Sequence, residues 1–266
     1  MKNIIIVLAC IFIVGCSQNK ERKNEAWKVY DEAAALSERH QYIEAMQLLD
    51  TLDVKYRDCL DQRRKGTDLR LNVMAALTRD SIAADELRLR NASQTVDSLA
   101  GQFKKVDLAG TDGYYVDKAV YTGDEMNSTG IQVRVDDEGY CYIIVNVSGR
   151  QIGLNSIRYE GVEATGHSMA VEGSEIMSIS QEDAENLLFA LCDAPAKAVV
   201  TLVGTKGKAT VTLSEKQIKS IRTTYDYSKA LQQKRLMSIR LEKLERQLAR
   251  LSDQLAMRYT PENEEK

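Results

Sequence analysis

Two long segments with heptad-spaced apolar residues flank a central block whose apolar residues alternate, and this arrangement most limits how the chain folds. Leu69 to Val106 and Ile218 to Leu255 each carry a seam of a and d positions, which Asp85 interrupts in the first segment. Each segment is about 38 residues, or roughly 57 Å as a helix. Equal lengths on either side of one inserted block favour an antiparallel coiled coil within the chain. Pairing between copies of the chain and a broader bundle are the alternatives.

The central block, residues 107–213, has the period of two that is typical of strands. Ile131, Val133 and Val135 alternate with polar residues, a turn follows at 136–139, and a returning strand begins at Cys141. A second hairpin is predicted from Lys197 to Leu213, together with short strands at 114–121, 156–160 and 175–178. A helix at 181–192, capped by Ser180, carries one apolar stripe. We expect this stripe to cover the sheet face that bears Tyr140, Tyr142 and Ile144.

The helical segments at the two ends have recognisable boundaries. Residues 214–217 form a capping box, Ser-Glu-Lys-Gln, so a long helix is predicted from there to a point before Pro261. Residues 25–57 have three-and-four spacings in two runs separated near 39–41, which indicates a helical hairpin. Its second half resembles the B helix of a tetratricopeptide repeat, and Ala33 and Leu36 of the first half fit the A helix of that repeat. Glu32 and Arg57 depart from the pattern of the repeat. A packed hairpin is favoured because only one unit is present, and a peptide-binding repeat is the alternative.

The amino terminus has the pattern of an export signal. Lys2 precedes an apolar run from Ile4 to Val14, which is too short to cross a bilayer. The run ends in Ile13-Val14-Gly15-Cys16, which resembles the lipobox of bacterial lipoproteins. The resemblance implies removal of residues 1–15, acylation of Cys16, and anchoring in a membrane through the acyl chains. Ser17 resembles the outer-membrane-sorted class, so we expect an envelope protein on the outer membrane that faces the periplasm.

These patterns together predict an α+β protein: an N-terminal helical hairpin and a long antiparallel coiled-coil stalk with an inserted antiparallel β-rich domain. The expected divisions are a signal peptide (1–15), a lipidated tether (16–24), the helical hairpin (25–57), a stalk helix (58–106), the β-rich domain (107–213), a returning stalk helix (214–259) and a tail (260–266).

The residues that ordinarily carry metal or thiol chemistry are few. Cys59, Cys141 and Cys192 remain after signal removal and acylation, and the pattern leaves open whether Cys141 and Cys192 pair or stay as free thiols. The two histidines lie in different regions, so no metal or cofactor is expected. The acidic turn at 136–138 lacks the alternating oxygen ligands of a calcium loop, and a solvated turn is favoured.

Two motifs have partial likeness to catalytic or phosphate-binding sites. Residues 166–170, Gly-His-Ser-Met-Ala, resemble the nucleophile elbow of α/β-hydrolases, but no histidine follows Ser168 in the chain and no helix is predicted after it. Residues 204–208, Gly-Thr-Lys-Gly-Lys, resemble the end of a P-loop, but Leu202 and Ala209 stand where that motif requires glycine and a hydroxyl residue. A surface β-loop and a hairpin turn are the favoured interpretations.

Composition excludes some functions and leaves a binding role. With 36 basic and 39 acidic residues and a net charge of -3, the chain lacks the one-sided field of a nucleic-acid-binding protein. We therefore expect a non-enzymatic lipoprotein that displays its β-rich domain to a protein partner or an assembly, with homo-oligomerisation through the coiled coil as one form. The alternative is capture of a glycan or peptide on the β-rich domain, for which Tyr140 and Tyr142 are the candidate residues.

Overall fold

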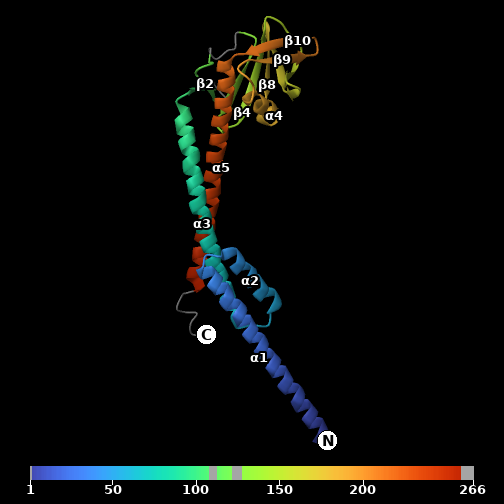
Figure 1. Ribbon diagram of the computed structural model, residues 1–266, viewed down its shortest axis with the longest axis vertical. Coiled ribbons are helices and arrows are strands. Elements are labelled where there is room, and N and C mark those ends of the chain that lie inside the picture. The colour runs from blue at the N-terminus through green and yellow to red at the C-terminus, as the bar shows by residue number, and fades with distance from the viewer. Residues whose placement is uncertain (1, 108–112, 122–127, 259–266) are drawn as a thin grey trace. The chain divides into compact units, whose positions relative to one another are not determined.

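The computed structural model describes residues 2–107, 113–121 and 128–258, with side chains from residue 19 onward. Helices and antiparallel sheets are both extensive, so the protein is of the α+β class. The chain divides into two compact units (Figure 1): a helical unit of residues 1–86 and 240–266, and a β-rich unit of residues 87–239. The helices α3 (Leu60–Ala100) and α5 (Glu215–Arg258) contribute residues to both units.

In the helical unit, α1 (Lys2–Glu38) and α2 (Tyr42–Lys55) lie side by side (Figure 1). The chain reverses at 39–41, where His40 has a positive φ of 59°. The two helices and the start of α3 enclose one apolar cluster, which explains the three-and-four spacings of residues 25–57. Its fully buried members are Ala26, Ala33, Leu49, Leu52, Tyr56 and Cys59.

The expected tether at 16–24 is helical in the structure. Helix α1 runs through these residues because no glycine or proline occurs between Cys16 and Glu38 and the segment is rich in Lys, Glu, Arg and Gln, which favour helices. Arg22 lies against the end of α2, where it contacts the Asp58 carboxylate at 2.9 Å and donates to the Lys55 carbonyl at 2.7 Å. Residues 19–25 are otherwise exposed, as a polar segment requires.

The seam residue Asp85 has a partner on α5. Its side chain is fully buried, and one carboxylate oxygen lies 2.6 Å from Nε of Arg240. Asp68 and Arg258 form a second ion pair between the same two helices within the helical unit. Asp85 follows Asp68 along α3, whereas its partner Arg240 precedes Arg258 along α5.

The first stalk helix was expected to reach residue 106, and this is wrong. Helix α3 ends at Ala100, a turn at 101–102 follows, and residues 103–106 form strand β1, which pairs with β2 (Tyr114–Asp117). Phe103 and Val106 continue the heptad spacing, but they are buried as sheet residues. Over only four residues, the spacing of apolar side chains fits a helix and a strand equally well. Pairing with β2 therefore decides that residues 103–106 form a strand.

The β-rich unit contains two antiparallel sheets. After β1 and β2 the strands are β3 (Gly130–Asp136), β4 (Cys141–Ser148), β5 (Leu154–Tyr159), β6 (Val162–Thr165), β7 (His167–Val171), β8 (Ser174–Ile179), β9 (Ala198–Gly204) and β10 (Gly207–Leu213). The six-stranded sheet has the order β1-β2-β3-β4-β8-β7 and the four-stranded sheet the order β10-β9-β5-β6. The predicted hairpins are present: β3 pairs with β4 around the turn at 136–140, and β9 pairs with β10 around Thr205 and Lys206.

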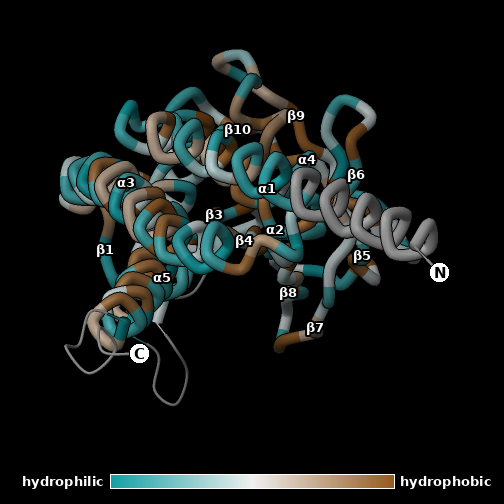
Figure 2. The backbone as a smooth tube through the Cα atoms, turned by 90° about the horizontal axis from the view of Figure 1, so that it is seen from below, coloured by the Kyte–Doolittle hydropathy of each residue, from teal (hydrophilic) through white to brown (hydrophobic). Residues whose placement is uncertain are grey.

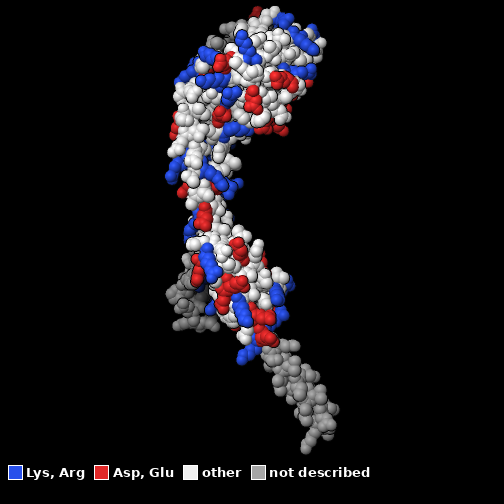
Figure 3. Space-filling model, in the orientation of Figure 1, with Lys and Arg blue, Asp and Glu red and all other residues white. Residues whose placement is uncertain are grey.

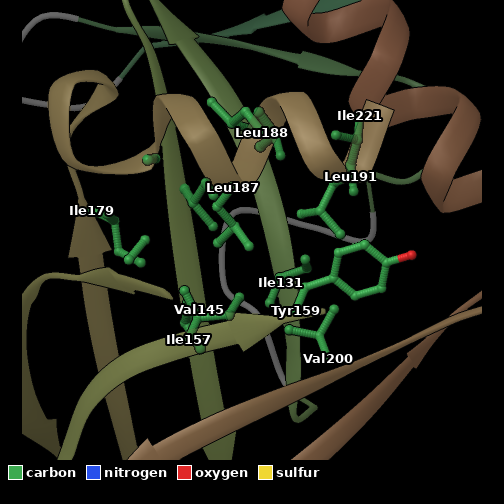
Figure 4. Packing of buried hydrophobic residues seen from close by; sticks show 14 of the residues in the cluster. Ile131, Val145, Ile157, Tyr159, Ile179, Leu187, Leu188, Leu191, Val200 and Ile221 are labelled. Carbon is green, nitrogen blue, oxygen red and sulfur yellow. The ribbon is translucent and has the colours of Figure 1, made fainter. Parts of the chain in front are cut away.

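Both sheets and helix α4 (Gln181–Cys192) share one apolar core (Figure 4). Leu187, Leu188 and Leu191 of α4 are completely buried in it with Ile143 and Val145 of β4. The expectation that α4 covers the Tyr140, Tyr142 and Ile144 face is therefore wrong: the helix packs on the opposite face, where the fully apolar side of β4 buries more surface. The other face instead carries a smaller cluster of Val106, Tyr114 and Val116, with Tyr121 and Tyr142 packed against it.

The capping residues act as the sequence predicts. Ser180 accepts a hydrogen bond from the Asp183 amide at 3.3 Å at the start of α4. At the start of α5, Ser214 accepts from the Gln217 amide at 3.4 Å, while Gln217 Oε1 accepts from the Ser214 amide at 2.9 Å. This reciprocal pair connects β10 directly to α5 and fixes where that helix begins.

Candidate functional site

A hollow of about 600 Å³ lies in the β-rich unit where the β3–β4 turn meets the first turn of α4. We call it the turn cleft. Both candidate residues from the sequence, Tyr140 and Tyr142, line it. Its walls are formed by Asp136, Tyr140, Cys141, Tyr142, Ser180, Gln181, Glu182 and Glu185.

The β3–β4 turn is shaped by its first residue. Oδ1 of Asp136 accepts hydrogen bonds from the amides of Glu138 at 2.9 Å and Tyr140 at 2.7 Å, and its carbonyl accepts from the Gly139 amide at 3.0 Å. An aspartate at the start of a turn satisfies the turn amides in this way. Gly139 has a φ of +91°, a conformation that other residues adopt only with strain.

The same turn is fastened to α5 and α4 by side-chain hydrogen bonds. The Gly139 carbonyl accepts from Ser228 Oγ at 2.7 Å and from Gln232 Nε2 at 2.9 Å. Gln232 Nε2 also lies 2.7 Å from Gln181 Oε1, and that oxygen accepts from the Cys141 amide at 2.8 Å. Two helices, α4 and α5, therefore hold the turn that places Tyr140 at the rim of the turn cleft.

The acidic side chains of the turn are engaged by basic residues. Asp137 lies 2.9 Å from Nζ of Lys105 on β1, and Glu138 lies 2.5 Å from the Arg235 guanidinium on α5. The Arg235 guanidinium lowers the pKa of Glu138, and the hydrogen bond that Lys105 donates to the Asp137 carboxylate raises the pKa of Lys105. The described residues hold no group of three or more side chains suited to a metal ion. The ion pairs with Lys105 and Arg235 hold the turn against β1 and α5.

Carboxylates give the turn cleft its charge. Asp136, Glu182 and Glu185 line it, and none of its eight lining residues is basic. Glu185 is balanced by Lys229 on α5 at 3.0 Å. Elsewhere on the visible face of each unit, basic and acidic side chains are intermixed (Figure 3). The turn cleft therefore favours a ligand that is cationic or neutral over one that is anionic.

The two tyrosines of the turn cleft differ in their surroundings. Tyr140 is 49% exposed. Tyr142 is half-buried beside Tyr114, whose ring has the Arg134 guanidinium 4.0 Å above its centre, and burial raises the pKa of Tyr142. Tyr142 thus forms a packed side of the turn cleft, and Tyr140 offers an accessible aromatic surface. Tyr114 and Tyr159, by contrast, are buried in the packing.

Tyr140 also borders a second hollow, of about 320 Å³, on its α5 side. The apolar side chains Leu236 and Ile239 line this hollow and are both exposed. Glu138, Gln232 and Arg235 complete it. The acidic turn cleft and this partly apolar hollow therefore adjoin each other at Tyr140.

The other residues that the sequence singled out lie in less chemically suggestive places. Ser168 is an exposed residue of β7, and β8 rather than a helix follows it. Residues 204–208 lie at the β9–β10 hairpin, as expected, with Thr205 and Lys206 forming its turn. Cys141 and Cys192 are not bonded to each other; burial raises the pKa of both thiols, that of Cys192 to about 11, so both are protonated at neutral pH.

The lipobox residues Ile13-Val14-Gly15-Cys16 belong to the part of α1 whose side chains lie outside the described residues. Over the residues with described side chains, no helix combines the length and apolar character needed to cross a membrane.

Sequence reasoning identified the two tyrosines and missed their supporting residues. Gln181 and Gln232 are polar helix residues far apart in the chain, and no local pattern connects them to the turn. Glu182 lies in the first turn of α4, where an acidic residue is typical of any helix, and Glu185 follows in the next turn. The acidic residues at 136–138 are the one local signal at this turn, and by themselves they indicate a solvated turn.

The chain matches no protein-family model, and comparison with curated proteins and with solved structures likewise found no match.

Proposed function

We propose that the protein is a non-enzymatic envelope lipoprotein, anchored to the outer membrane through Cys16 and facing the periplasm, whose β-rich unit binds a peptide segment of a protein partner in the turn cleft. The binding proposal rests on the turn cleft around Tyr140, which is acidic and aromatic and whose turn is held in place by α4 and α5. The anchoring proposal rests on the lipobox pattern at residues 13–16.

The proposed scaffold is an antiparallel helical stalk formed by α3 and α5. The ion pairs Asp68–Arg258 and Asp85–Arg240 support it in the helical unit. In the β-rich unit, residues between Arg88 and Leu99 share a groove with residues between Asp226 and Gln233, which is the order that antiparallel pairing requires. A buried ion pair within an apolar seam selects one register over others, as polar seam residues do in coiled coils.

The proposed ligand follows from the charges and shapes at Tyr140. A lysine or arginine side chain would lie among the carboxylates of Asp136 and Glu182 with its charge against the Tyr140 ring, where cation–π attraction adds to the ionic one. A neighbouring apolar side chain of the same peptide would cover Leu236 and Ile239. An aromatic anchor between a charged and an apolar subsite is typical of peptide recognition.

A glycan is the second candidate ligand. The half-exposed Tyr140 ring is an apolar surface on which a sugar face can stack. This alternative does not need the carboxylates, and neutralising them therefore distinguishes the two ligands.

The test is photo-crosslinking in the native envelope. A benzophenone amino acid replaces Tyr140 in the full-length protein, and the same amino acid at Phe189 serves as the control, because Phe189 is an exposed aromatic residue of the β-rich unit that does not line the turn cleft. We expect one discrete protein adduct at position 140 and none at 189. Glu182→Gln in the first variant should weaken the adduct.

Equal labelling at both positions, or no adduct at position 140, would contradict the binding proposal. A carbohydrate adduct that survives Glu182→Gln would favour the glycan instead.

A further inference from the structure

The connection between α2 and α3, residues 55–60, lies against the part of α1 that follows Cys16. Arg22 of α1 contacts the Asp58 carboxylate at 2.9 Å and donates to the Lys55 carbonyl at 2.7 Å. Figure 1 shows this connection beside α1, toward the N-terminal end of that helix. Arg22 follows Cys16 by six residues, which is roughly 9 Å along a helix axis. The connection is therefore close to the site of the proposed acylation.

Charge is segregated along α1 and α2. Residues 16–24 and 55–60, which we call the basic end of the helical unit, carry five basic and two acidic residues, a net charge of +3. Residues 25–54 carry two basic and seven acidic residues, a net charge of -5 with histidine neutral. One acidic residue of the basic end, Asp58, is already paired with Arg22. The positive part of the two helices is thus the part that adjoins the lipobox.

The basic side chains of this end face solvent. In Figure 2 the coloured part of α1 begins with the hydrophilic residues 19–24. The basic residues of the basic end are all exposed: Lys20, Arg22, Lys23, Lys55 and Arg57. A cluster of exposed lysines and arginines next to a membrane attachment point is typical of surfaces that bind anionic lipid headgroups.

Exposed apolar side chains lie among these charges. Leu60, the first residue of α3, is 71% exposed, and Val54, in the last turn of α2, is 66% exposed. Apolar side chains beside basic ones can enter the boundary between headgroups and acyl chains, where their burial adds to the attraction between charges. The basic end thus has both of the features that an interfacial contact uses.

We propose that the basic end docks on the surface of the membrane that holds the acyl chains of Cys16. Its lysine and arginine side chains lie among anionic phospholipid headgroups, and Val54 and Leu60 lie at the headgroup boundary. This inference rests on the proposed acylation of Cys16, and it adds a second attachment that holds the helical unit against the membrane. It does not depend on the ligand proposed for the turn cleft.

Proximity and charge together select a membrane as the occupant. The anchor would keep lipid headgroups roughly 9 Å from Arg22 at all times, a distance close to the Debye length of about 8 Å at physiological ionic strength. The same headgroups would repel the acidic residues of 25–54, so the segregated charge favours contact through the basic end over contact along the side of the hairpin. An acidic segment of a partner protein would match the charge, but nothing keeps such a segment near Cys16.

Lipid photo-crosslinking in vesicles of defined composition tests the docking. The benzophenone amino acid replaces Val54 in the full-length protein. Ile43 is the matched control position, because it is 61% exposed and precedes Val54 by eleven residues on α2, which is about three turns and hence the same helix face. The purified protein is reconstituted in vesicles of phosphatidylcholine with phosphatidylglycerol, or of phosphatidylcholine alone. We expect lipid adducts at position 54 in the anionic vesicles, several-fold fewer in the neutral vesicles, and few at position 43 in either.

Charge variants of the protein with benzophenone at position 54 make the result specific. Lys55→Gln with Arg57→Gln should lower the yield of lipid adduct at least fivefold, since each basic residue near an anionic surface strengthens binding about fivefold. Lys28→Gln with Arg39→Gln removes the same charge outside the basic end and should leave the yield nearly unchanged. All four residues are exposed, so these substitutions leave the apolar cluster of the helical unit intact.

Incorporation of labelled palmitate by the same protein reports on the anchor separately. Palmitate incorporation without lipid adducts at position 54 would overturn the docking and leave the anchor in place. Absence of palmitate would overturn the anchor, and the adducts in anionic vesicles would still decide the docking. Equal yields at positions 43 and 54, or equal yields in the two kinds of vesicle, would also overturn the inference. In the native envelope, a protein adduct at position 54 in place of lipid would show that a partner protein occupies the basic end instead.

Discussion

Gly139 connects the shape of the β3–β4 turn to its attachment on α5, and replacing it with alanine tests that connection. Its φ of +91° would cost an alanine about 1–2 kcal/mol. The added Cβ would also lie 2.9 Å from Cβ of Leu231 and 3.0 Å from the Gln232 amide nitrogen, so α5 or the turn must move. Overpacking of this kind costs about 1–3 kcal/mol more.

Gly149 supplies the matched control. It too has a positive φ, +76°, but a Cβ added there meets nothing within 4 Å. Gly149→Ala should therefore cost about 1–2 kcal/mol, the backbone strain alone. Gly139→Ala should cost about 2–5 kcal/mol in total. The difference between the two variants isolates the contact with α5.

Hydrogen exchange followed by mass spectrometry is the suitable assay, because the single tryptophan, Trp27, lies in the helical unit and does not report on the β-rich unit. Amides of β3 and β4 should exchange faster in Gly139→Ala than in Gly149→Ala. The benzophenone adduct at position 140 should be lost in the first variant only. Equal losses of protection in the two variants would show that attachment of the turn to α5 contributes nothing.

Three more outcomes are expected from further substitutions. Arg240→Met removes the ion pair of Arg240 with the buried Asp85 carboxylate and should lower the free energy of unfolding in urea by about 3 kcal/mol. Asp85→Leu restores an apolar seam and should be neutral or stabilising, and the opposite ranking would contradict a register-setting pair. Arg235 lowers the pKa of Glu138 from its ordinary 4.5, so the stability that this ion pair contributes is complete above pH 4.5 and is lost as the pH falls through the lowered pKa. Glu138→Gln should remove that part of the acid dependence of the melting temperature in thermal melts. Cys16→Ala should prevent incorporation of labelled palmitate, and continued labelling would refute acylation at this residue.

Local patterns were sufficient for the secondary structure that depends on neighbouring residues. The capping box at 214–217, the Ser180 cap, the β3–β4 and β9–β10 hairpins and the break at 39–41 all appear where the sequence places them. Each is determined by residues within a few positions of one another, whose hydrogen bonds and alternation are visible in the sequence.

Long-range packing decided the remainder. Phe103 and Val106 fit a helical seam equally well, and only pairing with β2 makes them strand residues. The stripe of α4 fits either face of the sheet, and burial beside Ile143 selects one. The turn cleft depends on Gln181 and Gln232, which meet the Gly139 turn from distant segments, and the basic end of the helical unit depends on Arg22, which meets residues 55–58 from another helix. The amino-acid pattern therefore determined which elements form. The tertiary structure determined which surfaces they bury and which they leave for a partner, because burial is a property of contacts between residues that no local spacing encodes.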